Sequence, residues 1–324
     1  MKRRLLWAIM YLRHGVDKRG YSINLVMPSV RLWGGLGNQM FQYAFGRRIA
    51  VESGQQVKFD LASGFKHDPY RRRFALGTFN VEILRAESHE CPLGISWTSP
   101  WSRVAKAGWS AMPAAWRRVV YEKTPFQFDS TVVANSKEGA YYFGYWQHEG
   151  YFATIQDELR WEFTLRTPFS EPVVALQEAM AGCRSVSVHI RQYHDIGADG
   201  KVIRKAREVH GACSLEYYQQ AFERIGFQPG TVCFIFSDNI QWVKENLKLP
   251  IPCRYVADEC PCSDVEELLL MASCQHHVIS NSSFSWWGAW LGRNPKKIVV
   301  APRIWVRSLP ESAVDICQKT WIKL

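Results

Sequence analysis

The sequence predicts an α/β protein with two Rossmann-like domains, each built on a parallel β-sheet, and a cleft between them. Two observations lead to this prediction. The chain has 324 residues, a length at which a single hydrophobic core has usually stopped growing. Short apolar segments also alternate with segments of helical periodicity, near the N-terminus and again through the second half. Parallel strands that are joined through helices produce this alternation.

The first domain is expected to open with a parallel βαβ unit. A strand covers residues 29–33, and a loop with three glycines follows it. In residues 39–52, apolar side chains recur every fourth position, which predicts a helix with one apolar stripe. A second strand covers residues 55–60, so strand, loop, helix and strand follow in the order of a parallel unit.

The second domain repeats this order more clearly. The apolar segment 231–236 predicts a strand buried on both faces. Ser214 is a good N-cap for a helix over 215–225. Further strands are predicted at 185–190, 276–280 and 297–302, and helices at 171–182, 215–225, 239–247, 264–274 and 283–291. We therefore predict a basic N-terminal extension over 1–28, a first domain over 29–165 with an aromatic, basic insert, and a second domain over 166–324.

The composition excludes several classes of protein. With 47% hydrophobic and 22% charged residues, the chain has an ordinary globular composition. The net charge of +10 suits nucleic acid, an anionic membrane or a phosphorylated ligand, but no nucleic-acid-binding motif is present, so we expect no nucleic acid partner. The nine cysteines are odd in number and irregularly spaced, which favours a reducing cytoplasm.

No metal site is expected. A zinc site can be imagined, but its spacing matches no pattern known to us. Its ligands would come from Cys253, Cys260, Cys262, Cys274, His276 and His277.

Four polar loops follow predicted strands, and ligands of open parallel sheets bind at the carboxyl ends of strands. The first loop contains Gly35, Gly37 and Asn38, where a backbone without side chains can approach an anion closely. A tight turn explains these glycines equally well. The loop lacks the GxGxxG fingerprint, which counts against a nicotinamide oxidoreductase.

The second and third loops carry charges of opposite sign. Arg191 ends a strand on the same face as His189, and its guanidinium can bind two phosphate oxygens at once. The alternative is a surface ion pair beside a core histidine. Asp238 follows the next strand, where its carboxylate can accept hydrogen bonds from a ribose or a base, or can cap the helix at 239–247.

The fourth loop is rich in serine. It consists of Asn281, Ser282, Ser283, Phe284 and Ser285, between a strand and a helix. Hydroxyl groups and the free amides of a first helical turn together form an anion site. Trp286 and Trp287, which follow, are expected in the core or in the wall of the site.

Five segments carry a more specific pattern: GGLGNQMFQYAFGR, GYWQHEGYF, GACSLEYYQQAFERI, FSDN and EELLLMASCQHHVISNSSFSWWGAWLGRNPKKIVVAP. Together they resemble glycosyltransferase family eleven, the α-1,2-fucosyltransferases, from about Val30 to Trp305. The apolar run 5–12 is too short to span a bilayer, so the chain resembles the bacterial branch rather than the anchored animal enzymes.

The resemblance implies a fold of GT-B type and an inverting transfer of fucose from GDP-fucose, the co-substrate, to a glycan acceptor. The acceptor group implied is the 2-hydroxyl of a galactose-type residue. No cofactor and no metal are implied, and the chain has no DxD triplet. The domain over 166–324 would bind GDP-fucose, and the domain over 29–165 would lie on the acceptor side.

The resemblance also implies roles for individual residues. His189 and Asp238 would contact the guanosine. The pyrophosphate would be held by Arg191 and by the loop of Asn281, Ser282, Ser283, Phe284 and Ser285. The glycine loop would close over the donor from the other domain through Gly35, Gly37 and Asn38.

One motif departs from the family. The usual HxRRxD is replaced by HIRQYHD, in which Arg191 is kept, Gln192 replaces the second arginine, and Asp195 comes one residue late. Arg191 and Asp195 are our catalytic candidates, with Asp195 as the base. Asp199 and a neutral His194 are alternatives, and a surface pair of Asp195 with Lys201 is the non-catalytic interpretation. The departure also leaves open a non-catalytic relative that only binds a sugar nucleotide.

Residues 97–123 interleave four tryptophans with basic residues. This combination favours the headgroup region of anionic bilayers. It predicts a cytoplasmic protein in peripheral contact with a bacterial inner membrane, or a lipid-linked acceptor. A helical hairpin with its tryptophans in the core is the alternative.

Overall fold

The computed structural model describes residues 27–66, 68–87, 90–91, 119–136, 139–193, 204–226 and 228–324. Three expectations concern residues that lie wholly or mostly outside these ranges, and they stay predictions. They are the N-terminal extension, the membrane-contacting segment with its tryptophans, and the role of Asp195.

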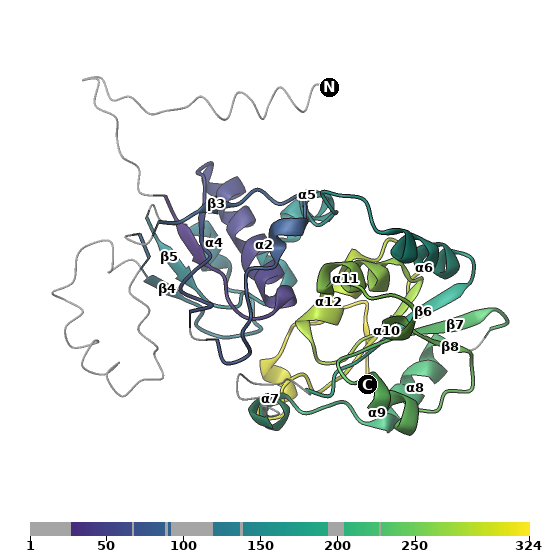
Figure 1. The fold of residues 1–324 in the computed structure, drawn as a ribbon. Coiled ribbons are helices and arrows are strands. Elements are labelled where there is room, and N and C mark those ends of the chain that lie inside the picture. Colours follow the sequence, from purple (N-terminus) through teal and green to yellow (C-terminus); the bar gives the residue numbers. More distant parts are fainter. Residues whose placement is uncertain are drawn as a thin grey trace, which may run out of the picture.

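The described residues form two α/β units, each built on a parallel sheet (Figure 1). The first unit contains β1 (Ser29–Arg31), α2 (Leu36–Ser53), β2 (Lys58–Asp60), β3 (Leu84–Arg85), β4 (Val119–Tyr121), α4 (Ser130–Ala134), β5 (Tyr141–Phe143) and α5 (Gln156–Glu162). Its strand order is β3-β2-β1-β5-β4, and every pair is parallel.

The second unit contains six described strands, again all parallel. The elements are α6 (Glu171–Ala181), β6 (Arg184–Ile190), α7 (Arg204–His210), α8 (Leu215–Ile225), β7 (Thr231–Ser237), α9 (Ile240–Asn246), β8 (Cys253–Tyr255), α10 (Val256–Glu259), α11 (Asp264–Ser273), β9 (His276–Val278), α12 (Ser283–Leu291), β10 (Val299–Ala301) and β11 (Ile322–Lys323). The strand order is β11-β10-β9-β6-β7-β8. Two such units confirm the predicted fold class, the GT-B type of arrangement.

The central strand β6 is buried on both faces. Val186, Val188 and Ile190 are fully buried in one cluster with side chains of α8. On the opposite face of the sheet, Phe234 and Phe236 of β7 pack against α6 and α11. Helices on both faces of the sheet therefore explain the continuous apolar runs of its strands.

Helix α2 differs from its prediction. The helix begins at Leu36, and its buried residues include Gln39, Gln42 and Gly46 as well as the predicted apolar stripe. The helix therefore has no solvent-facing side over its first turns. It lies between its own sheet and α12 of the other unit (Figure 1).

The units share an aromatic core at this contact. Phe41 of α2 lies 4.6 Å from Trp286 and 4.9 Å from Trp287 between ring centroids. Phe152 stacks on Trp287 at 5.2 Å. Because both tryptophans are fully buried, their predicted place in the core is confirmed.

The C-terminal segment returns to the first unit. Trp286 donates from Nε1 to the carbonyl of Ile316 at 2.8 Å, and the amide of Asp315 donates to the carbonyl of Phe126 at 3.1 Å. In the described part of the chain, no helix is long and apolar enough to span a membrane.

Candidate functional site

The first and fourth predicted loops meet where the units touch. Ser283 donates from its hydroxyl to Asn38 Oδ1 at 2.7 Å, and Gln147 donates to the same oxygen at 2.7 Å. Trp287 Nε1 donates to the carbonyl of Gly37 at 3.0 Å. The N-termini of α2 and α12 are therefore held together by side chains from both units.

The glycines of the first loop allow the N-termini of α2 and α12 to approach each other closely. Gly35 is the N-cap of α2, and Gly34 has a φ of +78°, which favours glycine. A Cβ on Gly37 would lie 2.5 Å from the carbonyl carbon of Ser283. The tight-turn interpretation therefore applies to Gly34, whereas Gly37 is needed for contact with α12.

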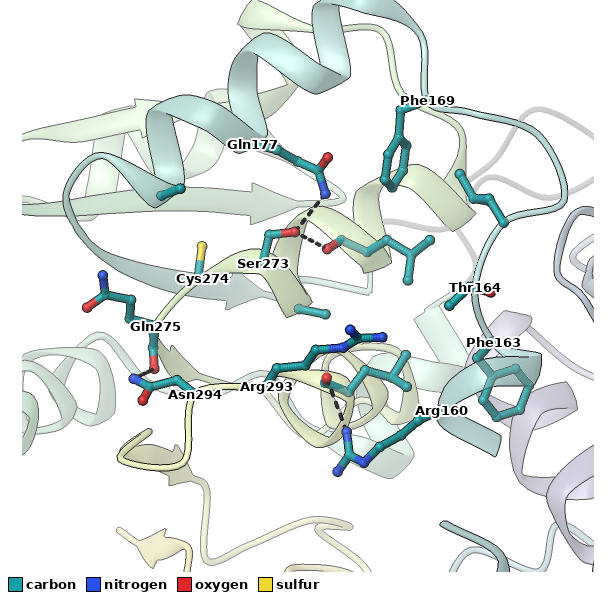
Figure 2. A pocket seen from close by; sticks show the side chains of 15 residues that line it. Arg160, Phe163, Thr164, Phe169, Gln177, Ser273, Cys274, Gln275, Arg293 and Asn294 are labelled. Atoms are coloured by element: carbon teal, nitrogen blue, oxygen red, sulfur yellow. Dashed lines mark hydrogen bonds between the residues drawn. The ribbon is translucent and has the colours of Figure 1, made fainter. Parts of the chain in front are cut away.

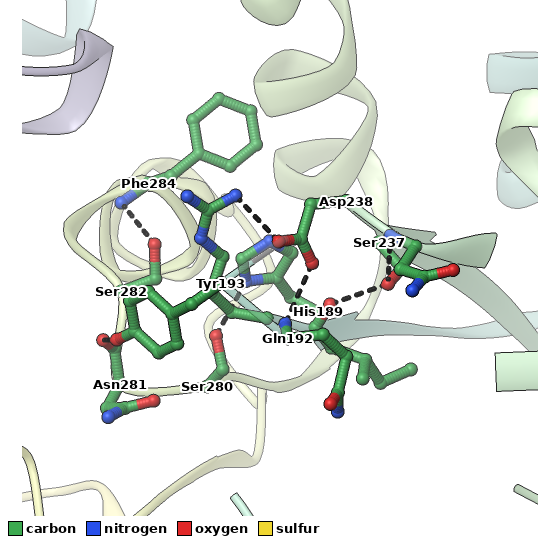
Figure 3. A network of polar contacts seen from close by, with 12 residues as sticks. His189, Gln192, Tyr193, Ser237, Asp238, Ser280, Asn281, Ser282 and Phe284 are labelled. Carbon is green, nitrogen blue, oxygen red and sulfur yellow. Dashed lines mark hydrogen bonds and ion pairs between the residues drawn. The ribbon is translucent and has the colours of Figure 1, made fainter. Parts of the chain in front are cut away.

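The second and third loops form one ion pair. Ile190 and Ser237 are partners in the parallel register, so the residues that follow them emerge side by side. Arg191 Nη1 lies 3.0 Å from Asp238 Oδ2, and the Gln192 amide donates to Asp238 Oδ1 at 2.8 Å. Figure 3 shows Asp238 turned toward the end of β6.

Asp238 does not cap α9, so that alternative is wrong. The N-cap is Asn239, whose Oδ1 accepts from the amide of Trp242 at 3.2 Å. The carboxylate of Asp238 is therefore directed to Arg191 and the loop after β6, at the carboxyl end of the sheet.

His189 is buried behind this pair. Its Nδ1 lies 2.8 Å from the hydroxyl of Ser280, and its ring lies 5.8 Å from that of Phe284 (Figure 3). Burial, and next the charge of Arg191, lower the pKa of His189 to about 3. The imidazole is therefore neutral at physiological pH.

The serine loop contains residues of different kinds. Ser282 caps α12 by accepting from the amide of Phe284 at 3.3 Å, and the hydroxyl of buried Ser285 donates back to the Ser282 carbonyl. Asn281 is buried, and its amide donates to the carbonyls of Gly211 at 2.7 Å and Trp305 at 3.2 Å. Of this loop, Ser282, Ser283 and Phe284 are partly accessible, whereas Asn281 fixes neighbouring segments.

Gln192 and Tyr193 occupy the altered part of the family motif. Gln192 is 4% exposed. Tyr193 has a φ of +55°, and its hydroxyl donates to the carbonyl of Asn281 at 2.9 Å. Its ring stacks on His210 at 5.5 Å. The contacts of Tyr193 join the loop after β6 to the serine loop, and Gln192, at the replaced arginine position, is buried.

A second cation at the site comes from the first unit. Burial, and then the charges of Arg191 and Arg72, lower the pKa of His210. Arg72 also lies 3.8 Å from the position of a Cβ on Gly35, which places it beside the glycine loop. Arg72 was not predicted as a site residue, because its one signal in the sequence is the short basic run at 71–73.

Glu267 is a further residue that the sequence analysis missed. It lies one turn into α11, and burial, Asp264 and Asp238 together raise its pKa to about 7. In the described residues its carboxyl has no hydrogen-bond partner. A buried carboxyl whose pKa is raised in this way is typical of a functional site. The one signal in the sequence was a glutamate pair at the start of an otherwise apolar helix.

The candidate site thus combines two guanidiniums, the N-terminal turn of a helix and the carboxylate of Asp238. The cationic groups and free amides of α12 suit a phosphate-bearing ligand. Neutral His189 with Asp238 and Glu267 suits the donor and acceptor atoms of a base or ribose. In the part of the chain that the structure describes, no group of three or more His, Cys, Asp or Glu residues could hold a metal ion.

The chain is similar to several known glycosyltransferases. A family model described as Glycosyl transferase family 11 matches residues 98–324. An alpha-1,2-colitosyltransferase from Escherichia coli is 30% identical over 91% of this chain and 97% of its own length. The O-antigen biosynthesis glycosyltransferase WbnK, also from Escherichia coli, is 28% identical over 90% of this chain and 99% of its own.

The solved structures to which the chain is similar are more distant in sequence. A mutant of Arabidopsis thaliana FUT1 in complex with GDP matches with a TM-score of 0.48 and 11% identity, over 92% of this chain and 74% of that chain. The fucosyltransferase NodZ from Bradyrhizobium matches with a TM-score of 0.43 and 14% identity, over 81% and 91%.

Proposed function

The chain belongs to glycosyl transferase family 11, and from this premise we propose that it transfers fucose from GDP-fucose to a glycan hydroxyl. The protein is a glycosyltransferase whose characterised relative forms α-1,2 linkages. The acceptor group that we propose is the 2-hydroxyl of a galactose-type residue. Transfer inverts the anomeric carbon of fucose.

The observation that carries the proposal is the contact between the glycine loop and the first turn of α12, beside Arg191. Asn38 and Ser283 come from different units and share a hydrogen bond of 2.7 Å. A diphosphate that binds there is in reach of amides at a helix N-terminus, a guanidinium from each unit and hydroxyl groups. These groups stabilise the negative charge that develops on departing GDP.

We assign each residue a role on this basis. Arg191 and the Ser282–Phe284 turn hold the pyrophosphate, and Arg72 adds positive charge from the acceptor-side unit. His189, Asp238 and Glu267 bind the guanosine. Gly35, Gly37 and Asn38 close the site, and Asn281 positions the serine loop through its amide.

Asp195 takes the proton of the acceptor hydroxyl as that oxygen attacks the anomeric carbon and the bond from that carbon to GDP breaks.

A second candidate donor is the GDP derivative of colitose, because the colitosyltransferase is 30% identical over most of the chain. Colitose is fucose without its 3-hydroxyl. A site that hydrogen-bonds this hydroxyl rejects the deoxy sugar strongly, whereas an apolar site discriminates weakly. The relative rates with the two donors therefore identify the natural sugar.

The relative in O-antigen biosynthesis supports a lipid-linked glycan as acceptor, used at the cytoplasmic face of a bacterial inner membrane. The insert at 97–123 would then contact the anionic surface. Its residues from 97 to 118 lie outside the described part of the chain, so this assignment rests on composition alone.

The test is a screen of galactosides with GDP-fucose and with GDP-colitose, with GDP release as the readout and the product linkage read by NMR. We expect release that depends on the acceptor and an α-1,2 product. GDP binding without any transfer across the screen would instead support the non-catalytic relative suggested by the altered HxRRxD motif.

A further inference from the structure

A cavity of about 470 Å³ lies where the chain passes from the first unit to the second. One wall comes from the end of α5 and the connection after it, and the other from α6, α11 and α12 (Figure 2). Apolar side chains cover much of it, namely Phe163, Leu165, Phe169, Leu269 and Leu291. The volume falls in the range of small-molecule sites.

The cavity is separate from the GDP-sugar site because α12 lies between them. Ser283 at its N-terminus contacts Asn38, whereas Leu291 at its C-terminus lines the cavity. Helix α12 has nine residues, so the two ends are about 13 Å apart. None of the proposed donor residues lines the cavity.

The cavity carries positive charge without a carboxylate. Arg160 and Arg293 belong to its lining, and none of the lining residues that the structure describes is acidic. Arg160 is anchored, with Nη1 donating to the Leu291 carbonyl at 3.2 Å and its guanidinium 4.2 Å from the centre of the Trp290 ring. Arg293 has no side-chain partner among the described residues, and Figure 2 shows it extending between Ser273 and Arg160.

The other polar side chains of the cavity are already engaged. Gln177 donates to the hydroxyl of Ser273 at 2.9 Å, and Ser273 donates to the carbonyl of Leu269 at 2.9 Å. Asn294 donates to the carbonyl of Gln275 at 3.0 Å. Arg293 is therefore the group that offers several N–H donors to a ligand.

The cationic side chains near the cavity repel one another, and this favours the binding of an anion. Burial, and next the charge of Arg293, lower the pKa of Arg160. Burial, and next the charge of Arg160, lower the pKa of Lys297 to about 8. Glu149 offsets part of this charge, but it accepts from Trp290 at 2.9 Å and does not line the cavity. An anion beside Arg293 and Arg160 would relieve the repulsion between these cations.

We propose that this cavity is a second binding site, for a small amphipathic anion: a carboxylate or phosphate monoester that carries an apolar group. Arg293 binds the anionic head by two N–H groups, Arg160 adds its charge, and the apolar group lies against Phe169 and Leu269. Because the walls belong to both units, the ligand stabilises the junction between them. The proposal does not depend on the identity of the donor sugar.

Calorimetric titration of the full-length protein with phenyl phosphate tests the site. We expect saturable binding that weakens about 10-fold or more in Arg293→Gln and is undetectable in Arg293→Glu. Arg224→Gln, which removes an exposed arginine from α8, is the matched control and should bind as the wild type does. Inorganic phosphate and benzyl alcohol should each bind at least 10-fold more weakly than phenyl phosphate.

Three results would overturn the proposal. The first is equal affinity in the wild type and Arg293→Gln. The second is a loss that follows Arg191→Gln and spares Arg293→Gln, which would place the anion at the donor site. The third is binding of inorganic phosphate as tight as that of phenyl phosphate, since the apolar wall would then contribute nothing. Melting temperatures of all variants without ligand verify that each is folded.

Discussion

Gly37 and Ser283 are in direct backbone contact, although they belong to different α/β units. A Cβ added to Gly37 would lie 2.5 Å from the carbonyl carbon of Ser283 and 2.6 Å from the amide nitrogen of Phe284. The same junction is fixed by the bond from Trp287 Nε1 to the Gly37 carbonyl at 3.0 Å. The first turn of α12 is thus positioned by a residue that has no side chain.

Gly37→Ala should therefore weaken both folding and donor binding. The methyl group would meet backbone atoms rather than a flexible side chain, so α2 and α12 must move apart. Overpacking of this kind costs about 1–3 kcal/mol. Urea unfolding and GDP titration measure the two effects. Gly77→Ala is the control, because its Cβ would meet nothing closer than 3.5 Å. Equal behaviour of both variants would contradict the contact.

Arg191 should matter most for turnover. Arg191→Ala removes a guanidinium that we place on the pyrophosphate, where charge develops as GDP leaves. Loss of such a contact lowers turnover about 100- to 1000-fold. Steady-state kinetics with saturating acceptor measure it, and circular dichroism checks the fold.

Arg191→Lys is the companion variant. An ammonium group does not reproduce the planar fork that binds Asp238 and a phosphate oxygen together, so rescue should be poor. Near-normal turnover in correctly folded Arg191→Ala would remove Arg191 from the donor site.

Local signals in the sequence predicted much of this fold. The serine-capped helix predicted at 283–291 is α12 (Ser283–Leu291), and Ser214 caps α8 by accepting from the Tyr217 amide at 3.1 Å. Both depend on residues a few positions apart, and such short-range patterns are visible in one sequence. The side-by-side placement of Arg191 and Asp238 likewise follows from two parallel strands.

Features that depend on contacts between distant segments of the chain could not be predicted from the sequence. The apolar stripe predicted on α2 is buried, as expected, but the burial of Gln39, Gln42 and Gly46 elsewhere on the helix depends on contacts with distant segments, which no local pattern reveals. Arg72 and Glu267 reach the site from separate elements. Asn281 is predicted to hold the pyrophosphate, and its side-chain amide also donates to three backbone carbonyls, because polar residues in loops serve packing and binding alike.

Stability should fall as the pH falls from 7 to 5. Burial is the main cause that lowers the pKa of His189 and of His277 to about 3, below the unfolded value of about 6.5. Below pH 6.5 the unfolded chain therefore binds protons that the folded chain does not. Each histidine then costs about 2 kcal/mol of stability at pH 5. Urea unfolding at pH 7, 6 and 5 measures the slope.

Glu267 acts in the opposite direction. Its folded pKa of about 7 is above the unfolded value, so it destabilises the neutral protein and this cost is relieved as the pH falls. Glu267→Gln should therefore be more stable at pH 7 and lose about 2 kcal/mol more than the wild type by pH 5. Parallel pH profiles for the two proteins would show that Glu267 titrates normally.

EDTA should leave transferase activity largely unchanged. In our proposal the charge of departing GDP is balanced by Arg191, Arg72 and the amides of α12, and the chain has no DxD triplet. Initial rates are compared after dialysis against EDTA, with and without added Mg²⁺ or Mn²⁺. A strict requirement for either ion would mean that these cationic groups are insufficient.

The last prediction concerns the base. An inverting displacement needs a group that takes the proton from the acceptor hydroxyl as it attacks. Asp195 is our candidate because it follows Arg191 at nearly the position of the family's carboxylate. Asp195→Asn should lower turnover about 100-fold or more with little change in GDP affinity, because the amide keeps the shape but accepts no proton. Asp199→Asn, four residues further along the chain, is the matched control and should keep most of the turnover. If Asp195→Asn weakens GDP binding while turnover at saturation persists, Asp195 positions the donor loop and another group is the base.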